Sequence, residues 1–219
     1  FDEIDGEGNT VSQGYIDTFR LQHPKRTLAE LLAGDLMMLP SASVIRSRAF
    51  AEVGGFDPDL TGYEDDDLFI RLFRAGWSSA FVNRRLTRFR VHLGSSSSTA
   101  SFRASRIAFQ DKLQREIPDD HRMNCYYIRD LVMPRLYQTT LNDYATAVRC
   151  GDLDEAVRIV ATIEALDQRA PGGIRRGIEL WLLRRPAVFL RFLRMHGRIP
   201  RPLRPTINAA LLGADGRRR

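Results

Sequence analysis

Apolar and polar positions follow different patterns in the two halves of the chain, and the change falls near residue 100. Before that point, short apolar runs separated by Gly, Pro and Ser predict strands mixed with short helices. The predicted strands are 41–47, 77–82 and 86–93, after a strand and turn within 1–14. The predicted helices of this half lie within 27–34, 47–55 and 64–76. The first half therefore reads as a mixed α/β region.

Capping residues indicate where these helices begin and end. Thr27 stands where an N-cap is needed, and Gly34 follows the end of the same helix. Ser47 is the expected N-cap of the second helix, with Gly54 in the C′ position after it. Gly76 is the matching C′ residue of the third helix. Each helix thus carries its own stop.

After residue 100 the pattern is helical. We expect helices within 102–116, 119–149 and 151–166, and a break at the Pro-Gly-Gly of 171–173. The apolar residues of the third helix that recur at helical spacing are Ala156, Ile159, Val160 and Ile163. This helix resembles one member of a tetratricopeptide-type pair, but such arrays need several repeats for stability. We therefore expect a packed helical extension.

The net charge of +6 is unevenly distributed. Residues 171–219 hold 12 Arg and two acids, a net charge of +10, while the other 170 residues have a net charge of −4. Arg mixed with Leu, Phe and Trp is the composition of a helix lying on an anionic membrane surface. A helical subdomain with a solvated Arg-rich face explains the composition of 171–219 equally well. Nucleic acid is the weaker third partner, because no recognition motif accompanies the charge.

The cysteines and the apolar runs limit the class of protein. Cys125 and Cys150 lack metal-ligand spacing, so we expect reduced thiols that are buried or half-buried. No apolar run approaches the roughly 18 to 20 residues that span a bilayer. The chain begins at Phe1 inside an apparent strand and turn, so we expect a fragment or processed product that is soluble or peripheral.

Four consecutive acids, Glu64 to Asp67, begin the third helix. At about 100° per residue, Asp65 falls in the middle of the apolar stripe, and Glu64 and Asp66 flank it. The stripe consists of Leu68, Phe69, Leu72 and Phe73. Asp67 falls on the opposite face, where it can form an i,i+4 pair with Arg71. The four acids therefore have different expected environments.

Helix electrostatics explain most of this cluster. Acids in a first turn complement the helix macrodipole by about 0.3 to 1 kcal/mol each, which accounts for Asp66 and Asp67. A carboxylate facing an apolar stripe must bond backbone N–H groups at the helix start or open into a cleft. In a cleft it has the character of a general base. Geometry alone leaves both roles open for Asp65.

Three sequence blocks, read in order, resemble the C-terminal half of the catalytic domain of glycosyltransferase family 2, which has the GT-A fold. The matching residues are Gly54, Gly55, Phe56 and Asp57; Glu64 and Asp65; Leu68, Arg71 and Gly76; and Phe89, Arg90 and His92. The resemblance covers 1–98 and implies a Rossmann-like α/β domain with a mixed sheet. An all-α extension over 99–170 and a basic amphipathic tail over 171–219 would follow it.

The resemblance implies a role for individual residues. Asp65 would be the general base that deprotonates an acceptor hydroxyl, with inversion at the sugar. His92 would help to hold a divalent metal, Mn²⁺ or Mg²⁺, on the donor diphosphate, and an imidazole suits Mn²⁺ better. Arg90 could assist there or be a surface strand arginine. Glu64 would be shared between helix start and site, and the Gly54-Gly55 pair would stop a helix and line the acceptor pocket.

The implied activity is the transfer of a sugar from a nucleotide-sugar donor to a hydroxyl of a glycan, lipid-linked or protein acceptor. The pathway would be cell-surface glycan or polysaccharide biosynthesis. We expect a cytoplasmic location, peripheral at the inner face of the membrane through 171–219. The alternative is a non-catalytic transferase remnant whose helical region binds a protein or a membrane.

The family's nucleotide-binding half and its metal-binding Asp-x-Asp should precede Phe1 and are not in the sequence. Residues 57–59 and 65–67 both spell Asp-x-Asp, but neither follows an upstream strand, so we reject both. We therefore expect the chain to be the C-terminal part of a longer transferase and to be inactive alone.

Overall fold

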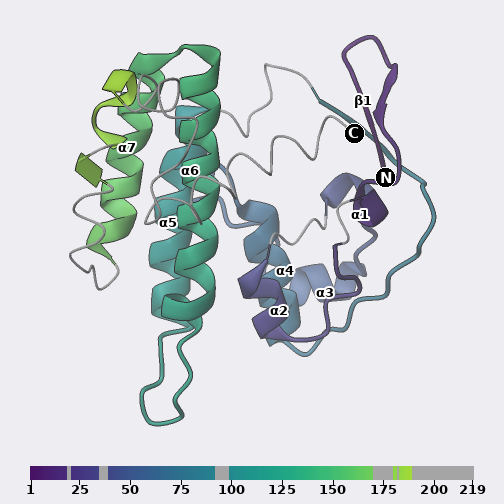
Figure 1. The fold of residues 1–219 in the computed structure, drawn as a ribbon. Coiled ribbons are helices and arrows are strands. Elements are labelled where there is room, and N and C mark those ends of the chain that lie inside the picture. Colours follow the sequence, from purple (N-terminus) through teal and green to yellow (C-terminus); the bar gives the residue numbers. More distant parts are fainter. Residues whose placement is uncertain (19–20, 35–38, 92–98, 170–179, 182, 189–219) are drawn as a thin grey trace. The chain divides into compact units, whose positions relative to one another are not determined.

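The computed structural model describes residues 1–18, 21–34, 39–91, 99–169, 180–181 and 183–188 (Figure 1). The chain divides into two compact units, Phe1–Tyr127 and Ile128–Arg219. Residues 99–127, which we had assigned to the helical extension, belong to the first unit. Among the described residues, no helix is both long and apolar enough to cross a membrane.

A small mixed sheet occupies one side of the first unit. Strands β1 (Asp2–Ile4) and β2 (Thr10–Ser12) are antiparallel, and β3 (Arg88–Arg90) lies parallel to β1 on its other side. The turn predicted at Asp5 joins β1 to β2, and the Asp5 carboxylate accepts a hydrogen bond from the Asn9 backbone N–H at 2.8 Å. The mixed sheet among helices confirms the α/β class of this region.

The four helices predicted in this part of the chain are present, and a short helix, α1, that was not predicted precedes them. In chain order, these helices are α1 (Tyr15–Thr18), α2 (Leu28–Ala33), α3 (Ser47–Glu52), α4 (Glu64–Arg74) and α5 (Ala100–Glu116). The Thr27 side chain caps α2 by accepting from the Glu30 N–H at 3.2 Å, as predicted. The stops at Gly54 (φ +80°) and Gly76 (φ +85°) are also confirmed. The N-cap of α3 is Arg46 instead of the predicted Ser47, which is its first helical residue.

Two predicted strands are absent from the described structure. Of residues 41–47, the first two lie in a 3-10 helix, η1 (Pro40–Ala42), residues 43–46 have no regular secondary structure, and Ser47 begins α3. Residues 77–82 also have no regular secondary structure and belong to no strand of the sheet. Among the described residues of the predicted strand 86–93, Arg88–Arg90 form β3, while 92 and 93 lie outside the described part of the chain. A strand needs a partner at hydrogen-bonding distance. Among the described residues the sheet consists of β2, β1 and β3, and neither segment pairs with any of them.

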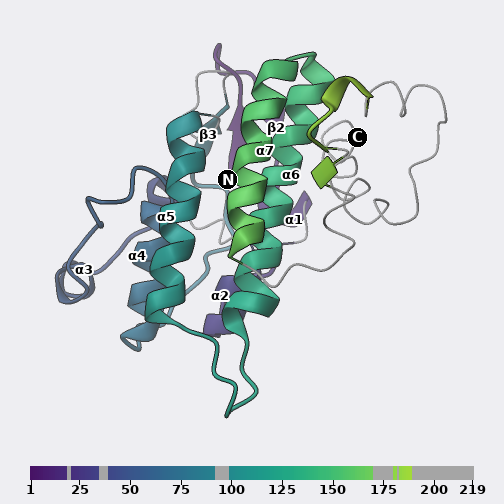
Figure 2. The same ribbon diagram turned by 90° about the vertical axis from the view of Figure 1, so that its left-hand side faces the viewer.

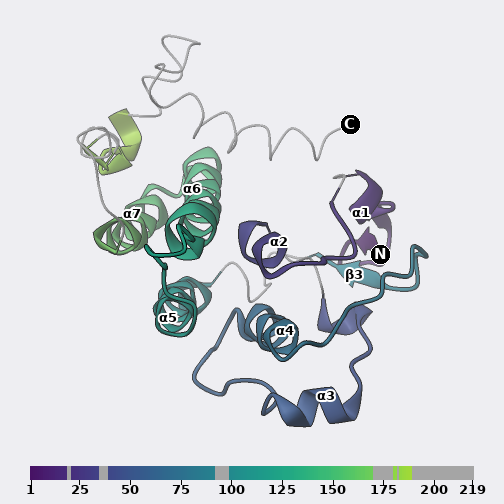
Figure 3. The ribbon, with the colours of Figure 1, turned by 90° about the horizontal axis from the view of Figure 1, so that it is seen from below.

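Helix α4 is the centre of the first unit, because it packs beside α2 and is joined by side chains to α5 (Figure 3). Leu68 and Ile70 are fully buried on α4, as is Leu31 on α2. From α5, Phe109 stacks on Tyr63 with ring centroids 5.1 Å apart. The buried apolar surface of this arrangement fixes the start of α4.

The second unit contains a helical hairpin. The π-helical turn η3 (Ile128–Val132) leads into α6 (Met133–Cys150), and α7 (Leu153–Gln168) lies beside α6 (Figure 2). Gly151 (φ +79°) ends α6, and the Asp152 side chain caps α7. The four residues predicted at helical spacing on α7 are buried in the core between the two helices: Ala156, Ile159, Val160 and Ile163.

The two cysteines lie in different units and are both free. Cys125 is half-buried, as predicted, whereas Cys150 is exposed because it is the last residue of α6. The predicted break at 171–173 and the basic tail fall outside the described residues, apart from 180–181 and 183–188.

Candidate functional site

The acid-led helix begins at a residue with unusual backbone geometry. Tyr63, the N-cap of α4, has φ 66° and ψ 10°, and its side chain does not cap the helix. Instead, the ring is buried against Phe109 and Phe102, and its hydroxyl accepts a hydrogen bond from Arg106 Nε at 2.7 Å. A non-glycine residue in the left-handed region persists only where its surroundings hold it there. Packing from α5 therefore sets where the four acids stand.

Asp67 is the most buried of the four acids, with 1% of its surface exposed. One carboxylate oxygen accepts from Arg71 Nε at 2.8 Å, and the other lies 2.7 Å from Lys112 Nζ of α5. The predicted i,i+4 pair with Arg71 is confirmed. The face opposite the predicted apolar stripe is buried at Asp67, because Lys112 of α5 contacts its carboxylate there.

Asp66 is also buried, at 8% exposure. Ile70 was the sequence signal for the burial of these two acids. With Glu64 at 0°, Ile70 falls near 240° on the helix projection, between Asp66 and Asp67. Ile70 is fully buried, so apolar packing surrounds α4 instead of covering one stripe.

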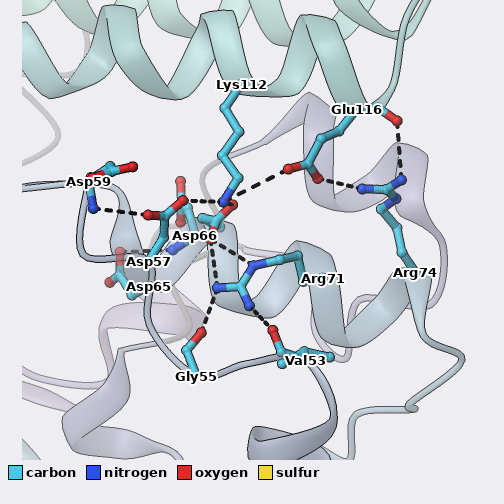
Figure 4. A network of polar contacts seen from close by, with 11 residues as sticks. Val53, Gly55, Asp57, Asp59, Asp65, Asp66, Arg71, Arg74, Lys112 and Glu116 are labelled. Carbon is cyan, nitrogen blue, oxygen red and sulfur yellow. Dashed lines mark hydrogen bonds and ion pairs between the residues drawn. The ribbon is translucent and has the colours of Figure 1, made fainter.

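Arg71 connects the acid-led helix to the Gly-Gly turn that ends α3. Its guanidinium donates to the Val53 carbonyl and, at 2.7 Å, to the Gly55 carbonyl (Figure 4). Gly55 has φ +71°, which favours glycine, and a Cβ there would lie 3.1 Å from the Phe50 ring. One arginine thus fixes the turn of 54–57 against α4.

Lys112 extends the same network to Asp57, at 2.6 Å from its carboxylate (Figure 4). The hydrogen bond from Lys112 lowers the pKa of Asp57. Burial alone would lower the pKa of Lys112, but its hydrogen bonds to Asp57 and Asp67 raise it overall. Beside it, Arg74 pairs with Glu116 at 2.6 Å. These contacts lock α4, α5 and the turn before α4 into one body.

Asp65, the predicted base, is half-buried in the first turn of α4, and Glu64 beside it is half-buried too. One Asp65 oxygen accepts from the Asp66 backbone N–H at 2.9 Å. The sequence left two roles open for Asp65, a bond to backbone N–H groups at the helix start or a place in a cleft. This hydrogen bond is the first of the two. The structure therefore brings together Asp65, Glu64 and the Gly54-Gly55 turn within one locked element.

The strand residues of the predicted site stand apart from this cluster. Arg90 on β3 donates to the backbone carbonyls of Asp5 at 2.8 Å and of Gly6 at 2.6 Å. These bonds tie β3 to the β1–β2 turn and favour the structural alternative for Arg90. His92 lies outside the described residues. Among the described residues, no three His, Cys, Asp or Glu side chains are grouped to hold a metal ion. The metal site therefore stays a prediction.

A cavity of about 820 Å³ opens in the first unit. Phe69, Leu72 and Phe73 of α4 line it, together with residues 42–46 and 77–87. Asp65 is not among the lining residues.

Comparison with known proteins found no match to any protein-family model, to any curated protein or to any solved structure. The resemblance to glycosyltransferase family 2 therefore rests on the three sequence blocks alone.

Proposed function

We propose that residues 1–98 are the C-terminal part of a glycosyltransferase family 2 domain of GT-A fold. The reaction is transfer of a sugar from a nucleotide-sugar donor to an acceptor hydroxyl, and Asp65 is its general base. The first unit is mixed α/β, which is compatible with such a domain.

The observation that carries the proposal is the pair of bonds from Arg71 to Val53 and Gly55. In the sequence, the Gly-Gly-Phe-Asp block and the Glu-Asp helix are separate parts of the resemblance. In the structure, the arginine of the second block holds the glycines of the first, and Asp57 of the first block joins Asp67 through Lys112. These contacts support a geometry in which the start of α4 is held rigid.

A rigid helix start suits a base. A general base must come within about 2.6 to 3.2 Å of the proton that it removes, so positioning matters as much as pKa. The ion pairs of Asp67 and Asp57 with Lys112 serve to hold α4, and Asp65, two residues before Asp67, is half-buried in the first turn of the same helix. We propose that this carboxylate accepts the proton of the acceptor hydroxyl as the hydroxyl attacks the anomeric carbon.

The donor side of the reaction lies elsewhere. A divalent metal would neutralise the diphosphate leaving group, and we propose His92 as one of its ligands. The nucleotide-binding half is proposed to come from polypeptide ahead of Phe1, so the 219 residues alone should not transfer sugar. Sugar transfer by the isolated chain would contradict this part of the proposal.

The test is Asp65→Asn in the longer transferase, assayed by nucleoside diphosphate release from a panel of nucleotide-sugars with Mn²⁺ and a membrane extract as acceptor. Asn keeps an oxygen that can accept from the Asp66 N–H, so the fold should be retained. Loss of a general base should lower turnover by about 10² to 10⁴-fold.

Asp59→Asn is the matched control, because Asp59 is an exposed acid in the turn before α4 and has no proposed role. Its turnover should equal that of the unmodified enzyme. Unchanged turnover in Asp65→Asn would remove Asp65 from the mechanism. Absence of turnover from every form would favour the non-catalytic remnant.

A further inference from the structure

The described part of the basic tail, 180–181 and 183–188, is fastened to the helical hairpin of the second unit (yellow-green in Figure 1). Leu183 is buried in the core between α6 and α7, and Leu180 packs against the same core. The Leu183 carbonyl accepts a hydrogen bond from the Tyr144 hydroxyl at 3.0 Å. These two leucines therefore complete the core of the second unit, and they are not the side chains that a membrane would take up.

Trp181 of the same segment points outward. It is 54% exposed, although Trp is highly buried on average in folded proteins. The guanidinium carbon of Arg185 lies 4.3 Å from the centroid of its ring, which is the geometry of a cation–π contact. Val188 is exposed as well, at 48%. The segment thus presents two apolar side chains and one arginine outside the core that its leucines complete.

The charges around this segment favour an anionic partner. Arg184 Nε lies 2.6 Å from Glu164 of α7, and this ion pair offsets an acidic charge that would otherwise repel such a partner. The sequence that follows is strongly basic, because residues 189–219 hold eight Arg and one Asp, a net charge of +7. Charge of one sign over this length suits a continuous anionic surface.

We propose that Trp181, Arg185 and Val188 are the contact through which the second unit docks on an anionic phospholipid bilayer. Trp is typical of the headgroup level of a membrane, where the ring lies in the apolar boundary and its N–H stays hydrated. Arg185 binds lipid phosphate beside the ring, and Val188 enters the same boundary. The leucines stay in the hairpin core, so docking requires no unfolding of the second unit.

The exposed apolar side chains favour a bilayer over a nucleic acid. A nucleic acid would pair its phosphates with arginine and stack a base on the Trp181 ring, but it would leave Val188 in water. A bilayer interface takes up both apolar side chains together with the charge. The inference uses only the second unit and does not depend on Asp65 or on sugar transfer.

Tryptophan fluorescence of the full chain tests the proposal, because the chain has two tryptophans and Trp77→Phe leaves Trp181 as the reporter. With vesicles of phosphatidylserine and acyl-brominated phosphatidylcholine, Trp181 emission should shift to shorter wavelength and lose about half of its intensity, because the ring then lies beside the acyl chains. Vesicles of brominated phosphatidylcholine alone should cause neither change at the same lipid concentration. If Trp77→Phe does not fold, the difference in emission between the unmodified chain and Trp181→Phe gives the same reading.

Trp181→Ser should weaken binding to the anionic vesicles about tenfold, since binding scales with the apolar area that the interface buries. Arg185→Gln should weaken it about fivefold, the loss expected for one basic residue at the surface. Val11→Ser, at an exposed apolar residue of β2 in the other unit, should leave binding unchanged.

Four results would overturn the proposal. One is no binding to anionic vesicles, and another is binding that leaves Trp181 emission unchanged, since the contact would then lie elsewhere in the chain. An equal shift with inorganic phosphate would make the ligand a free phosphate instead of a lipid headgroup. A single-stranded oligonucleotide that shifts the emission and releases the chain from vesicles would make the partner a nucleic acid. None of these outcomes changes with the result of Asp65→Asn, so the two proposals fail separately.

Discussion

Lys112 is the residue on which the ion-pair cluster of the first unit depends. It is largely buried, and its ammonium group lies 2.6 Å from Asp57 and 2.7 Å from Asp67. Breaking a buried pair by removing one partner leaves the other charge uncompensated, which costs about 3 to 5 kcal/mol. Arg71 still pairs with Asp67 when Lys112 is absent, so we expect Lys112→Met to lower the free energy of unfolding by about 2 to 3 kcal/mol. Urea denaturation measures the change.

The exposed Arg115 on the same helix provides the control, because Arg115→Met should change the free energy of unfolding by less than about 0.5 kcal/mol. Equal losses in the two variants would contradict the role given to Lys112.

The same cluster predicts how stability changes with pH. The pKa of Asp57 is lowered in the folded state, so its contribution is present above its usual pKa of about 3.9 and is lost as the pH falls through the lowered value. The pKa of Lys112 is raised, so its contribution is present below about 10.4 and is lost as the pH rises through the raised value. Denaturation midpoints should therefore fall below about pH 4 and above about pH 10.5. In Lys112→Met both slopes should be smaller, and unchanged slopes would count against this origin.

At the scale of elements, the turn between α3 and α4 should tolerate little change. Gly55 has φ +71°, and a Cβ on it would lie 3.1 Å from two atoms of the Phe50 ring. The left-handed conformation costs a non-glycine residue about 1 to 2 kcal/mol, and the contact adds to that. We expect Gly55→Ala to lower the free energy of unfolding by about 1 to 3 kcal/mol in urea denaturation. Gly6→Ala, where nothing lies within 4 Å of the added atom, should be close to neutral.

The helices were predictable because their signals are local. The Thr27 cap and the glycine stops lie within a few residues of the helices that they bound. The strands predicted at 41–47 and 77–82 are absent, because a strand forms only where a partner pairs with it. The described residues contain no strand partner for these segments. The same holds for Asp67, which is buried by Lys112 of α5, a residue that no local pattern connects to it.

At the scale of the whole molecule, the charge of residues 171–219 predicts binding to anionic membranes. The net charge of +10 over 171–219 should attract anionic headgroups, each basic residue near the surface contributing about 1 kcal/mol. The full chain should float with liposomes that contain phosphatidylserine, and a chain without 171–219 should not. Neutral phosphatidylcholine liposomes are the control. Equal flotation of both chains would exclude the tail as the membrane-binding segment.

The division into two compact units predicts that they unfold separately. Ile163 is fully buried between α6 and α7, whereas Leu68 is fully buried on α4 in the other unit. Truncating either side chain to Ala should cost about 2 to 5 kcal/mol, because it removes apolar contacts and leaves a cavity. If each unit has its own core, Ile163→Ala should speed amide exchange in α6 and α7 and leave α4 unchanged, and Leu68→Ala should do the reverse. Exchange that rises in both units with either variant would mean that the units unfold as one. Among the described residues, the core formed by Leu141, Tyr144, Val148 and the buried face of α7 is built from the second unit, which is the physical reason to expect independence.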